Sequence, residues 1–258
     1  MRANSLRVGC VQYLNARPLI RGWPEEVVFD HPAALCEGLR RGDLDVALVS
    51  SFEFLRNPIY SIVDGISISS QGPVYSVMVA HAGPASMDEI ELDPASVTSV
   101  AMLQYLMSER GRAFNPCEMA DDKLAPLPPR RGRLLIGDQA IRFRYKFGNE
   151  YSYWDLGEEW EGLAKSPFVY ALWLINPGVP GKEMIADRLR SLRDANLANI
   201  DQLIASEEEF DHDFCARYYR DHVSFAFGKE EKKGLQKFHG LCEEHGLLPK
   251  RAVEFAVV

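Results

Sequence analysis

The first residues that could carry out chemistry lie directly after an apolar segment near the N-terminus. Residues 8–19 read VGCVQYLNARPL, so an apolar run is followed at once by the amide of Asn15 and the guanidinium of Arg17. An amide both donates and accepts hydrogen bonds, and a guanidinium binds carboxylates, so the pair suits an anionic ligand. The same residues also fit a plain turn, in which Asn15 bonds nearby backbone and Arg17 faces solvent.

Other polar residues come at the ends of further predicted strands. They are Ser50 and Ser51 after one strand, Ser69, Ser70, Gln71 and Gly72 after the next, and Gly137 and Asp138 after a third. A second group, Ser96, Thr98 and Ser99, stands at the start of a predicted helix, where free N–H groups and the helix dipole favour a carboxylate or phosphate. Serines and threonines at such positions also act as ordinary strand ends and helix caps, and both interpretations stay open.

The elements that must position these residues follow a β-α-β pattern. Residues 6–12, 27–31 and 44–50 are predicted strands, and residues 32–41 form a predicted helix with apolar residues at helical spacing. In open α/β sheets, ligands bind beyond the carboxyl ends of the strands, so the polar residues above are expected at one cleft. Hydroxyl and amide groups dominate this set, which indicates a site for a small polar anion.

Two long apolar runs, residues 74–80 and 168–175, bracket a middle segment of the chain. If both runs cross between lobes, the middle segment is an inserted lobe and the two ends of the chain build the other. We therefore expect one lobe from residues 1–84 and 176–258, and a second from residues 85–175. The predicted fold class is α/β, with a central cleft and two crossing hinge strands.

The composition excludes several classes of partner. The 258 residues carry a net charge of −8, which argues against nucleic acid and anionic membrane surfaces. We see neither a signal peptide nor an apolar run long enough to span a membrane. The five cysteines are scattered and odd in number, which is typical of reduced thiols in a cytoplasmic protein. We expect a small-molecule substrate and no metal, and the sequence indicates no oligomeric state.

Several stretches, taken in order, resemble the chorismate dehydratase family of the futalosine route to menaquinone. They are VQYLNARPL, RRGDLDVALVSSFEFLRNP, ISSQGPVYSVMV, VTSVAMLQYLM, LLIGDQAI and DLGEEWEGLAKSPFVYALW. The resemblance implies a fold similar to type 2 periplasmic binding proteins, used as a hydro-lyase in the cytoplasm without a cofactor. The implied substrate is chorismate, a dianion, and the implied product is 3-[(1-carboxyvinyl)oxy]benzoate. The chain departs from the family pattern at Val49, where the family has proline, and at residues 164–167.

The resemblance also implies which residues act on the substrate. Asn15 in YLN and Ser76 in GPVYS match functional positions of the family, while Thr98 and Ser99 are candidates for holding a substrate carboxylate. Because the predicted cleft offers no evident general base, we expect the substrate's own enolpyruvyl carboxylate to remove the proton. Two alternatives remain: a solute-binding protein that catalyses nothing, and the sibling enzyme of the same route, which acts on dehypoxanthine futalosine.

Overall fold

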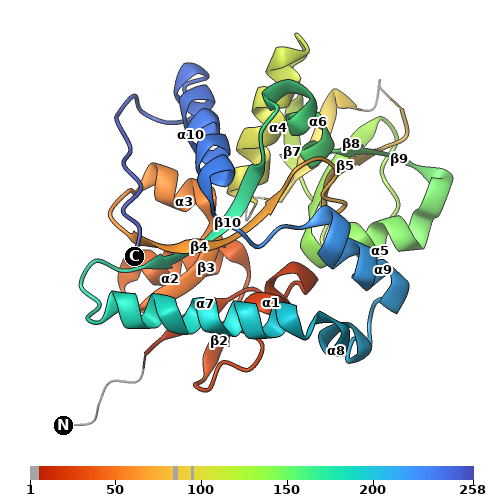
Figure 1. The fold of residues 1–258 in the computed structure, drawn as a ribbon. Coiled ribbons are helices and arrows are strands. Elements are labelled where there is room, and N and C mark those ends of the chain that lie inside the picture. The colour runs from red at the N-terminus through yellow and green to blue at the C-terminus, as the bar shows by residue number, and fades with distance from the viewer. Residues whose placement is uncertain (1–5, 84–86, 94–95) are drawn as a thin grey trace.

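The structure, a computed structural model, describes residues 6–83, 87–93 and 96–258. Within these residues the strands form two mixed sheets of five strands each, with helices packed around them (Figure 1). The first sheet has the order β2-β1-β3-β10-β4 and the second the order β7-β6-β8-β5-β9. The polar strand ends predicted from the sequence are therefore divided between two sheets.

The first sheet is built from both ends of the chain. Its strands are β1 (Val8–Cys10), β2 (Val27–Phe29), β3 (Val46–Ser50), β4 (Ser61–Ser70) and β10 (Phe168–Ile175). β1 is parallel to both β2 and β3, as the β-α-β pattern predicts, whereas β10 runs antiparallel between β3 and β4. The apolar sequences of β3 and β10 suit this central position, where both faces of the sheet are covered.

The second sheet is built from the middle of the chain. Its strands are β5 (Val77–His81), β6 (Glu89–Leu92), β7 (Asn115–Glu118), β8 (Arg131–Ile136) and β9 (Ser152–Asp155). β6 is parallel to β7 and β8, while β5 runs antiparallel to β8 and β9. The second sheet therefore repeats the plan of the first, with one antiparallel strand set among parallel ones.

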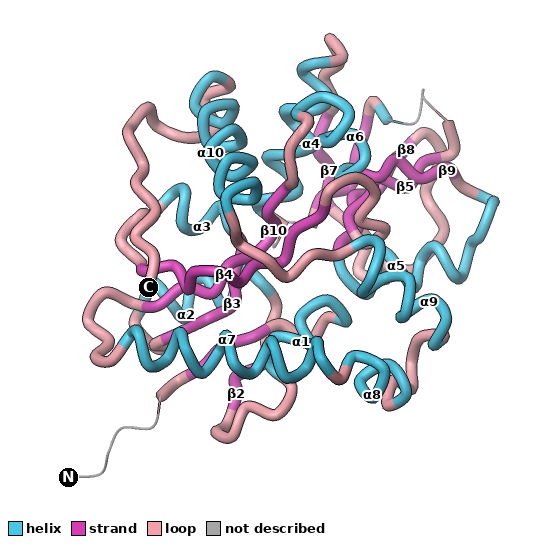
Figure 2. The backbone as a smooth tube through the Cα atoms, viewed as in Figure 1, coloured by secondary structure: helices cyan, strands magenta, loops and turns pink. Residues whose placement is uncertain are grey.

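Helices cover the faces of both sheets, as the tube view shows (Figure 2). Those around the first sheet are η1 (Leu14–Ala16), α1 (Arg17–Ile20), α2 (Pro32–Arg41), α3 (Ser51–Arg56), α7 (Lys182–Ala198) and α10 (Lys229–Glu244). Those of the second are α4 (Val97–Glu109), α5 (Gly137–Phe147), η3 (Gly148–Glu150) and α6 (Leu156–Ala164). The segment between α7 and α10 holds α8 (Ile200–Ala205), α9 (His212–Arg217) and a single π-helical turn, η4 (Tyr218–His222). Within the described residues, none of these helices has the length and apolar character needed to cross a membrane.

The chain passes between the two sheets at two neighbouring points. β4 ends in the first sheet and β5 begins in the second, and β10 returns to the first sheet after α6. The two crossings lie side by side because Ser70 at the end of β4 pairs with Phe168 at the start of β10. The sheet to which each strand belongs therefore gives lobe boundaries that differ from those expected from the sequence. We propose that lobe 1 comprises residues 6–70 and 168–258 and that lobe 2 comprises residues 77–164. The short segments 71–76 and 165–167 are then the crossings.

Candidate active site

A cavity lies where the two sheets meet. About 650 Å³ of space that no protein atom fills lies in it, and this figure includes the open solvent at its mouth. Lobe 1 contributes to its lining from the segment after β1 and from β3, β4 and β10, and lobe 2 contributes the starts of α4 and α5. The strand ends that the sequence predicts at one cleft thus meet at the junction of the lobes.

The polar groups in this cavity are all neutral. Within the described part of the chain, the lining contains no Asp, Glu, His, Cys, Lys or Arg side chain. Its polar side chains are Tyr13, Asn15, Ser50, Ser76, Ser96, Thr98, Ser99 and Tyr170. Burial raises the pKa of Tyr170 well above its ordinary value, so this phenol stays protonated. The cavity can therefore hold an anion through hydrogen bonds, but the side chains that line it offer no base suited to neutral pH.

Asn15 is held in the lining by contacts to the residue before it. It lies on η1, and the backbone of Leu14 is fixed on both sides, because its N–H donates to Asp138 (2.7 Å) and its carbonyl accepts from the Tyr219 hydroxyl (2.9 Å). Asn15 Oδ1 is buried and has no hydrogen-bond partner among the described residues. A buried acceptor without a partner is costly, so this oxygen is available to a ligand.

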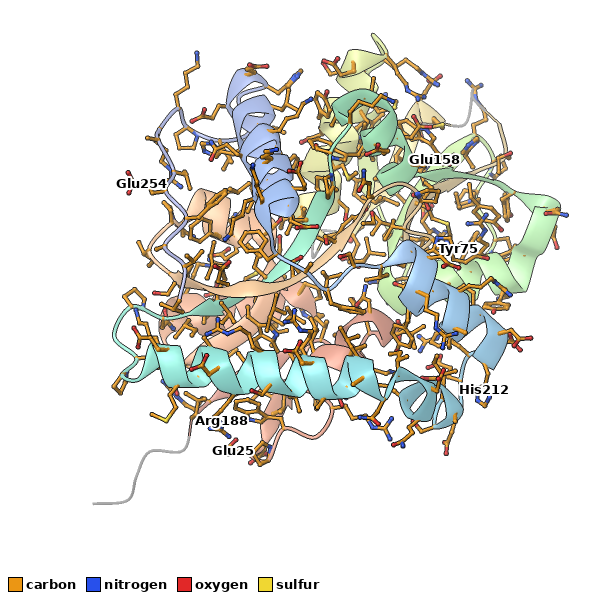
Figure 3. The ribbon with its side chains drawn as sticks, in the orientation of Figure 1. Glu25, Tyr75, Glu158, Arg188, His212 and Glu254 are labelled. Atoms are coloured by element: carbon orange, nitrogen blue, oxygen red, sulfur yellow. The ribbon has the colours of Figure 1, made fainter. Side chains whose placement is uncertain are left out.

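Ser76 reaches the cavity from the first crossing. Its side chain is fully buried, its Oγ accepts a hydrogen bond from the Tyr218 hydroxyl (2.7 Å), and its carbonyl accepts from the Gly137 N–H (2.7 Å). The residue before it, Tyr75, has a φ of 68°, which non-glycine residues seldom adopt. Figure 3 shows Tyr75 beside α9, where its ring packs on Phe214 at 5.1 Å between centroids.

The strained turn before Ser76 is held by a buried carboxylate. Asp155 caps α6 by accepting from the Gly157 and Glu158 N–H groups, and it also accepts from the N–H groups of Val74 (3.1 Å) and Tyr75 (2.7 Å). One side chain thus joins the start of α6 to the crossing segment. The unfavourable backbone of Tyr75 persists because these bonds fix the two peptide groups that precede its Cα.

The start of α4 presents hydroxyl and N–H groups to the same space. Ser96 precedes the helix without capping it through its side chain, and its buried Oγ has no partner among the residues that the structure describes. Thr98 and Ser99 lie in the first turn and line the cavity, where the helix dipole favours negative charge. The Thr98 hydroxyl also contacts that of Ser50 at the end of β3, so the two lobes touch across the cavity.

Six of the predicted site residues line this cavity: Asn15, Ser50, Ser76, Thr98, Ser99 and Gly137. The other six lie outside its lining and are withdrawn from the set that we propose to bind substrate: Ser51, Ser69, Ser70, Gln71, Gly72 and Asp138. Between the two serines after β3, the structure therefore places Ser50 at the cavity. Substrate contact by the residues in the lining stays a prediction.

Local bonding explains why these residues do not line the cavity. The Ser51 hydroxyl donates to the Val169 carbonyl (2.6 Å), and the backbone of Ser69 pairs with that of Ser224. The Ser70 hydroxyl forms a hydrogen bond with the Tyr170 hydroxyl (3.0 Å). Gln71 is exposed, and Gly72 lies in the turn with a φ of 94°. Successive residues of a strand place their side chains on opposite faces of the sheet, so only some residues of each predicted run can face one cavity.

Asp138 points away from the cavity, into a second hollow on the other side of Tyr13. Its carboxylate accepts from the Leu14 N–H and lies 4.0 Å from Arg17, which also pairs with Glu207. Burial raises the pKa of Asp138 to about 6, partly opposed by the Leu14 hydrogen bond and by Arg17. Asp138 and Arg17 therefore join the two lobes and do not line the cavity.

Three tyrosines at the site are missed in the sequence prediction. Tyr13 stands in the same stretch as Asn15, so the strand-end rule could have included it, and Tyr170 lies inside the apolar run of β10. Tyr218 lies 142 positions beyond its partner Ser76, in a helical region with no local pattern that marks it. Only the fold brings this residue to the site.

The comparisons with known proteins agree with this architecture. Protein AF1704 from Archaeoglobus fulgidus has a TM-score of 0.76 at 20% identity, over 94% of this chain and 98% of that one. The periplasmic aliphatic sulphonate-binding protein SsuA from Escherichia coli has a TM-score of 0.64 at 14% identity, over 97% and 90% of the two chains. At these identities the likeness shows the fold alone, and it confirms the predicted two-lobed, periplasmic-binding-protein-like class.

The sequence comparisons are more specific. A protein from Thermus thermophilus named chorismate dehydratase is 27% identical over 253 residues, which cover 90% of this chain and 93% of that protein. The model of the menaquinone biosynthesis family matches residues 6–244. Because this match spans nearly the whole chain and includes both lobes and the cavity between them, the protein belongs to the menaquinone biosynthesis family.

Proposed function

We propose that this chain is a chorismate dehydratase, a carbon–oxygen lyase that removes water from chorismate to give 3-[(1-carboxyvinyl)oxy]benzoate. The family match and the Thermus thermophilus relative support this assignment. The observation that carries it is the chemistry of the cavity, in which hydroxyl and amide groups surround apolar walls and no charged side chain of the described residues takes part. Such a site can hold an anionic ring without supplying a strong base.

The proposed fit to chorismate follows from the distribution of donors. The substrate is a cyclohexadiene with two carboxylates and one hydroxyl, so it needs an apolar slot for the ring and donors at its edges. Val11, Leu48 and Ile68 supply apolar walls, and the first turn of α4 supplies N–H and hydroxyl donors for a carboxylate. We assign Thr98 and Ser99 to one substrate carboxylate.

The proposed reaction is a substrate-assisted elimination. The enolpyruvyl carboxylate takes the proton from the ring carbon that bears the ether, and the electrons of that C–H bond become part of the ring. The neighbouring C–O bond breaks, hydroxide leaves, and it combines with the proton to form water. The ring carboxylate is conjugated with the carbon that loses the proton, so donors at α4 stabilise the charge that develops there.

The protein contributes position more than reactive groups. Holding the enolpyruvyl carboxylate over the ring makes proton removal intramolecular, and such positioning contributes about 7–11 kcal/mol in favourable cases. We assign Asn15 and Ser76 to the reacting carboxylate or the departing hydroxyl, because both line the cavity and each is fixed by buried hydrogen bonds. Contact of the lobes over the cavity excludes water from the reacting atoms.

Incubating the purified chain with chorismate tests the function directly. We expect a new aromatic product, lighter than chorismate by one water, by mass spectrometry and ultraviolet absorbance. Dehypoxanthine futalosine, offered in parallel, is expected to stay unchanged. Saturable chorismate binding without turnover would instead identify a solute-binding protein, and turnover of dehypoxanthine futalosine would identify the sibling enzyme.

The roles of Asn15 and Ser76 have their own test. Asn15→Ala and Ser76→Ala should each lower kcat by at least about tenfold, the equivalent of 1.4 kcal/mol in the barrier, because each removes a group that orients the reacting atoms. Ser51→Ala is the matched control, since Ser51 is as fully buried as Ser76 but donates its hydrogen bond to the Val169 carbonyl, outside the cavity. Unchanged turnover in either of the first two variants would remove that residue from the mechanism.

We also propose that the enzyme acts in the cytoplasm. All five cysteines are free thiols, and the four in lobe 1 are buried. Burial raises the pKa of Cys36 and Cys242 to about 12, so these thiols stay protonated and unreactive. Free structural thiols are typical of a reducing compartment.

A further inference from the structure

One buried phenol contacts both residues that we assign to catalysis. The Tyr218 hydroxyl donates to Ser76 Oγ over 2.7 Å, and the side chain of Asn15 lies next to the same hydroxyl. Tyr218 is fully buried and does not line the cavity itself. It therefore stands behind the site, where it can act on a ligand only through Asn15 and Ser76.

The directions in which Asn15 and Ser76 can bond a ligand follow from the groups that are already paired. Asn15 Oδ1 is buried and has no partner among the described residues, so it remains an acceptor for a ligand. The Tyr218 hydroxyl passes its own hydrogen to Ser76 Oγ. The Ser76 hydroxyl is an acceptor in that bond, which leaves its own hydrogen for the cavity.

The backbone around Tyr218 is specialised for this position. It begins η4, a single π-helical turn closed by a bond from the Val223 N–H to the Tyr218 carbonyl (3.1 Å). Within this turn two successive side chains face the site, because the Tyr219 hydroxyl reaches the Leu14 carbonyl next to Asn15. The ring of Tyr218 also stacks on Phe214, with 5.6 Å between centroids. π-helical turns are rare in proteins, and many of those that are found lie at functional sites.

We propose that Tyr218 is a positioning residue whose hydroxyl, by donating to Ser76 and lying next to the Asn15 side chain, fixes the directions in which these two side chains bond a ligand. This arrangement leaves Ser76 as a donor and Asn15 Oδ1 as an acceptor, both facing the cavity. That pair matches the departing hydroxyl of the substrate, whose oxygen accepts from Ser76 and whose hydrogen is accepted by Asn15. This inference rests on the proposed dehydratase function and deepens it.

Tyr218→Phe tests the proposal, because it removes one oxygen atom and keeps the ring. We expect kcat to fall by about tenfold or more with KM changed by less than about threefold, since the variant still offers every group that touches substrate. The loss should be smaller when Tyr218→Phe is introduced into Ser76→Ala than into the parent protein, because residues in one network are not additive. An unchanged kcat, or an equal loss in both backgrounds, would overturn the proposal.

A matched control and a second readout separate this result from instability and from the function itself. Tyr151→Phe removes a phenol that accepts from the Leu127 N–H in lobe 2, and it should leave kcat unchanged. Without any substrate, the side-chain amide resonance of Asn15 in the ¹H–¹⁵N spectrum, assigned by its loss in Asn15→Ala, should move in Tyr218→Phe and not in Tyr151→Phe. If chorismate proves not to be the substrate, this spectrum still decides whether Tyr218 positions Asn15: a stationary resonance contradicts it.

Discussion

At the scale of single residues, Gly137 shows how closely the two lobes approach. It has a φ of 57°, and its N–H donates to the Ser76 carbonyl. A Cβ at this position would lie 2.8 Å from the ring of Tyr13, which belongs to the other lobe. Gly137 is therefore required both by its backbone conformation and by the ring packed against it.

Gly137→Ala should consequently lower activity more than an alanine placed at another left-handed backbone position would. We expect kcat/KM to fall by at least about tenfold, because the added methyl displaces Tyr13 and shifts the turn that holds Ser76. Gly111→Ala is the matched control, since Gly111 has a φ of 60° with open space around it. Steady-state kinetics on both variants decide the matter, and similar losses would show that the contact with Tyr13 is irrelevant.

Part of the site can be predicted from single residues in the sequence. The strand-end rule selects Asn15, Ser50 and Gly137, and the helix-start rule selects Thr98, because both rules depend only on local pattern. Neither rule can tell which of two adjacent serines faces inward, since a short error in register reverses the faces of a strand. Tyr218 is beyond both rules, because its contact with Ser76 exists only after the chain has folded.

At the scale of elements, the first crossing and the start of α6 depend on one side chain. Asp155 accepts hydrogen bonds from four backbone N–H groups, two of them in the crossing segment and two in α6. An ordinary helix cap satisfies fewer groups and reaches no second segment. The fold thus concentrates the support of its strained turn in a single carboxylate.

Asp155→Ala should therefore destabilise the protein more than the loss of an ordinary cap. We expect the free energy of unfolding to fall by about 2–4 kcal/mol, because several buried N–H groups lose their acceptor. Asp211→Ala, which removes the cap of α9 and its bond from the Phe214 N–H, should cost about 1 kcal/mol. Urea denaturation measures both, and equal losses would contradict the special role of Asp155.

Elements with strong local signals are the ones that the sequence predicts well. The helix over residues 32–41 is confirmed with the same bounds, because a proline begins it, apolar residues repeat at helical spacing and Gly42 ends it with a φ of 75°. The strands β6, β7 and β9 are missed, since each has four residues and β7 contains Pro116. Their existence depends on pairing with distant strands, which local pattern does not encode.

At the scale of the whole molecule, the two lobes are joined by a carboxylate whose charge is unfavourable when buried. Asp138 of lobe 2 bonds the Leu14 N–H of lobe 1, and burial raises its pKa from 3.8 to about 6. The folded protein therefore binds this proton more tightly than the unfolded chain does. Stability associated with this group is present at low pH and is lost as pH rises from about 4 to about 6.

Asp138→Asn should reveal this effect, because it keeps an acceptor for the Leu14 N–H and removes the charge. At pH 8 we expect the variant to be more stable than the parent by up to about 3 kcal/mol, the equivalent of the difference between the two pKa values. At pH 4 the two proteins should be nearly equal in stability. Denaturant unfolding across this pH range is the measurement, and a constant difference at all pH values would refute the assignment.

The return of the chain to the first sheet through β10 determines the order in which the strands of the two lobes are synthesised. β10, which lies between β3 and β4 in the first sheet, follows every strand of the second sheet along the chain. A nascent chain emerging from the ribosome therefore has all the strands of lobe 2 before it has the strand that joins β3 to β4 in lobe 1. The two ends of lobe 2 also lie close together, since Ser70 pairs with Phe168, so excising residues 71–167 and bridging the gap with a short turn would leave the strands of the first sheet intact.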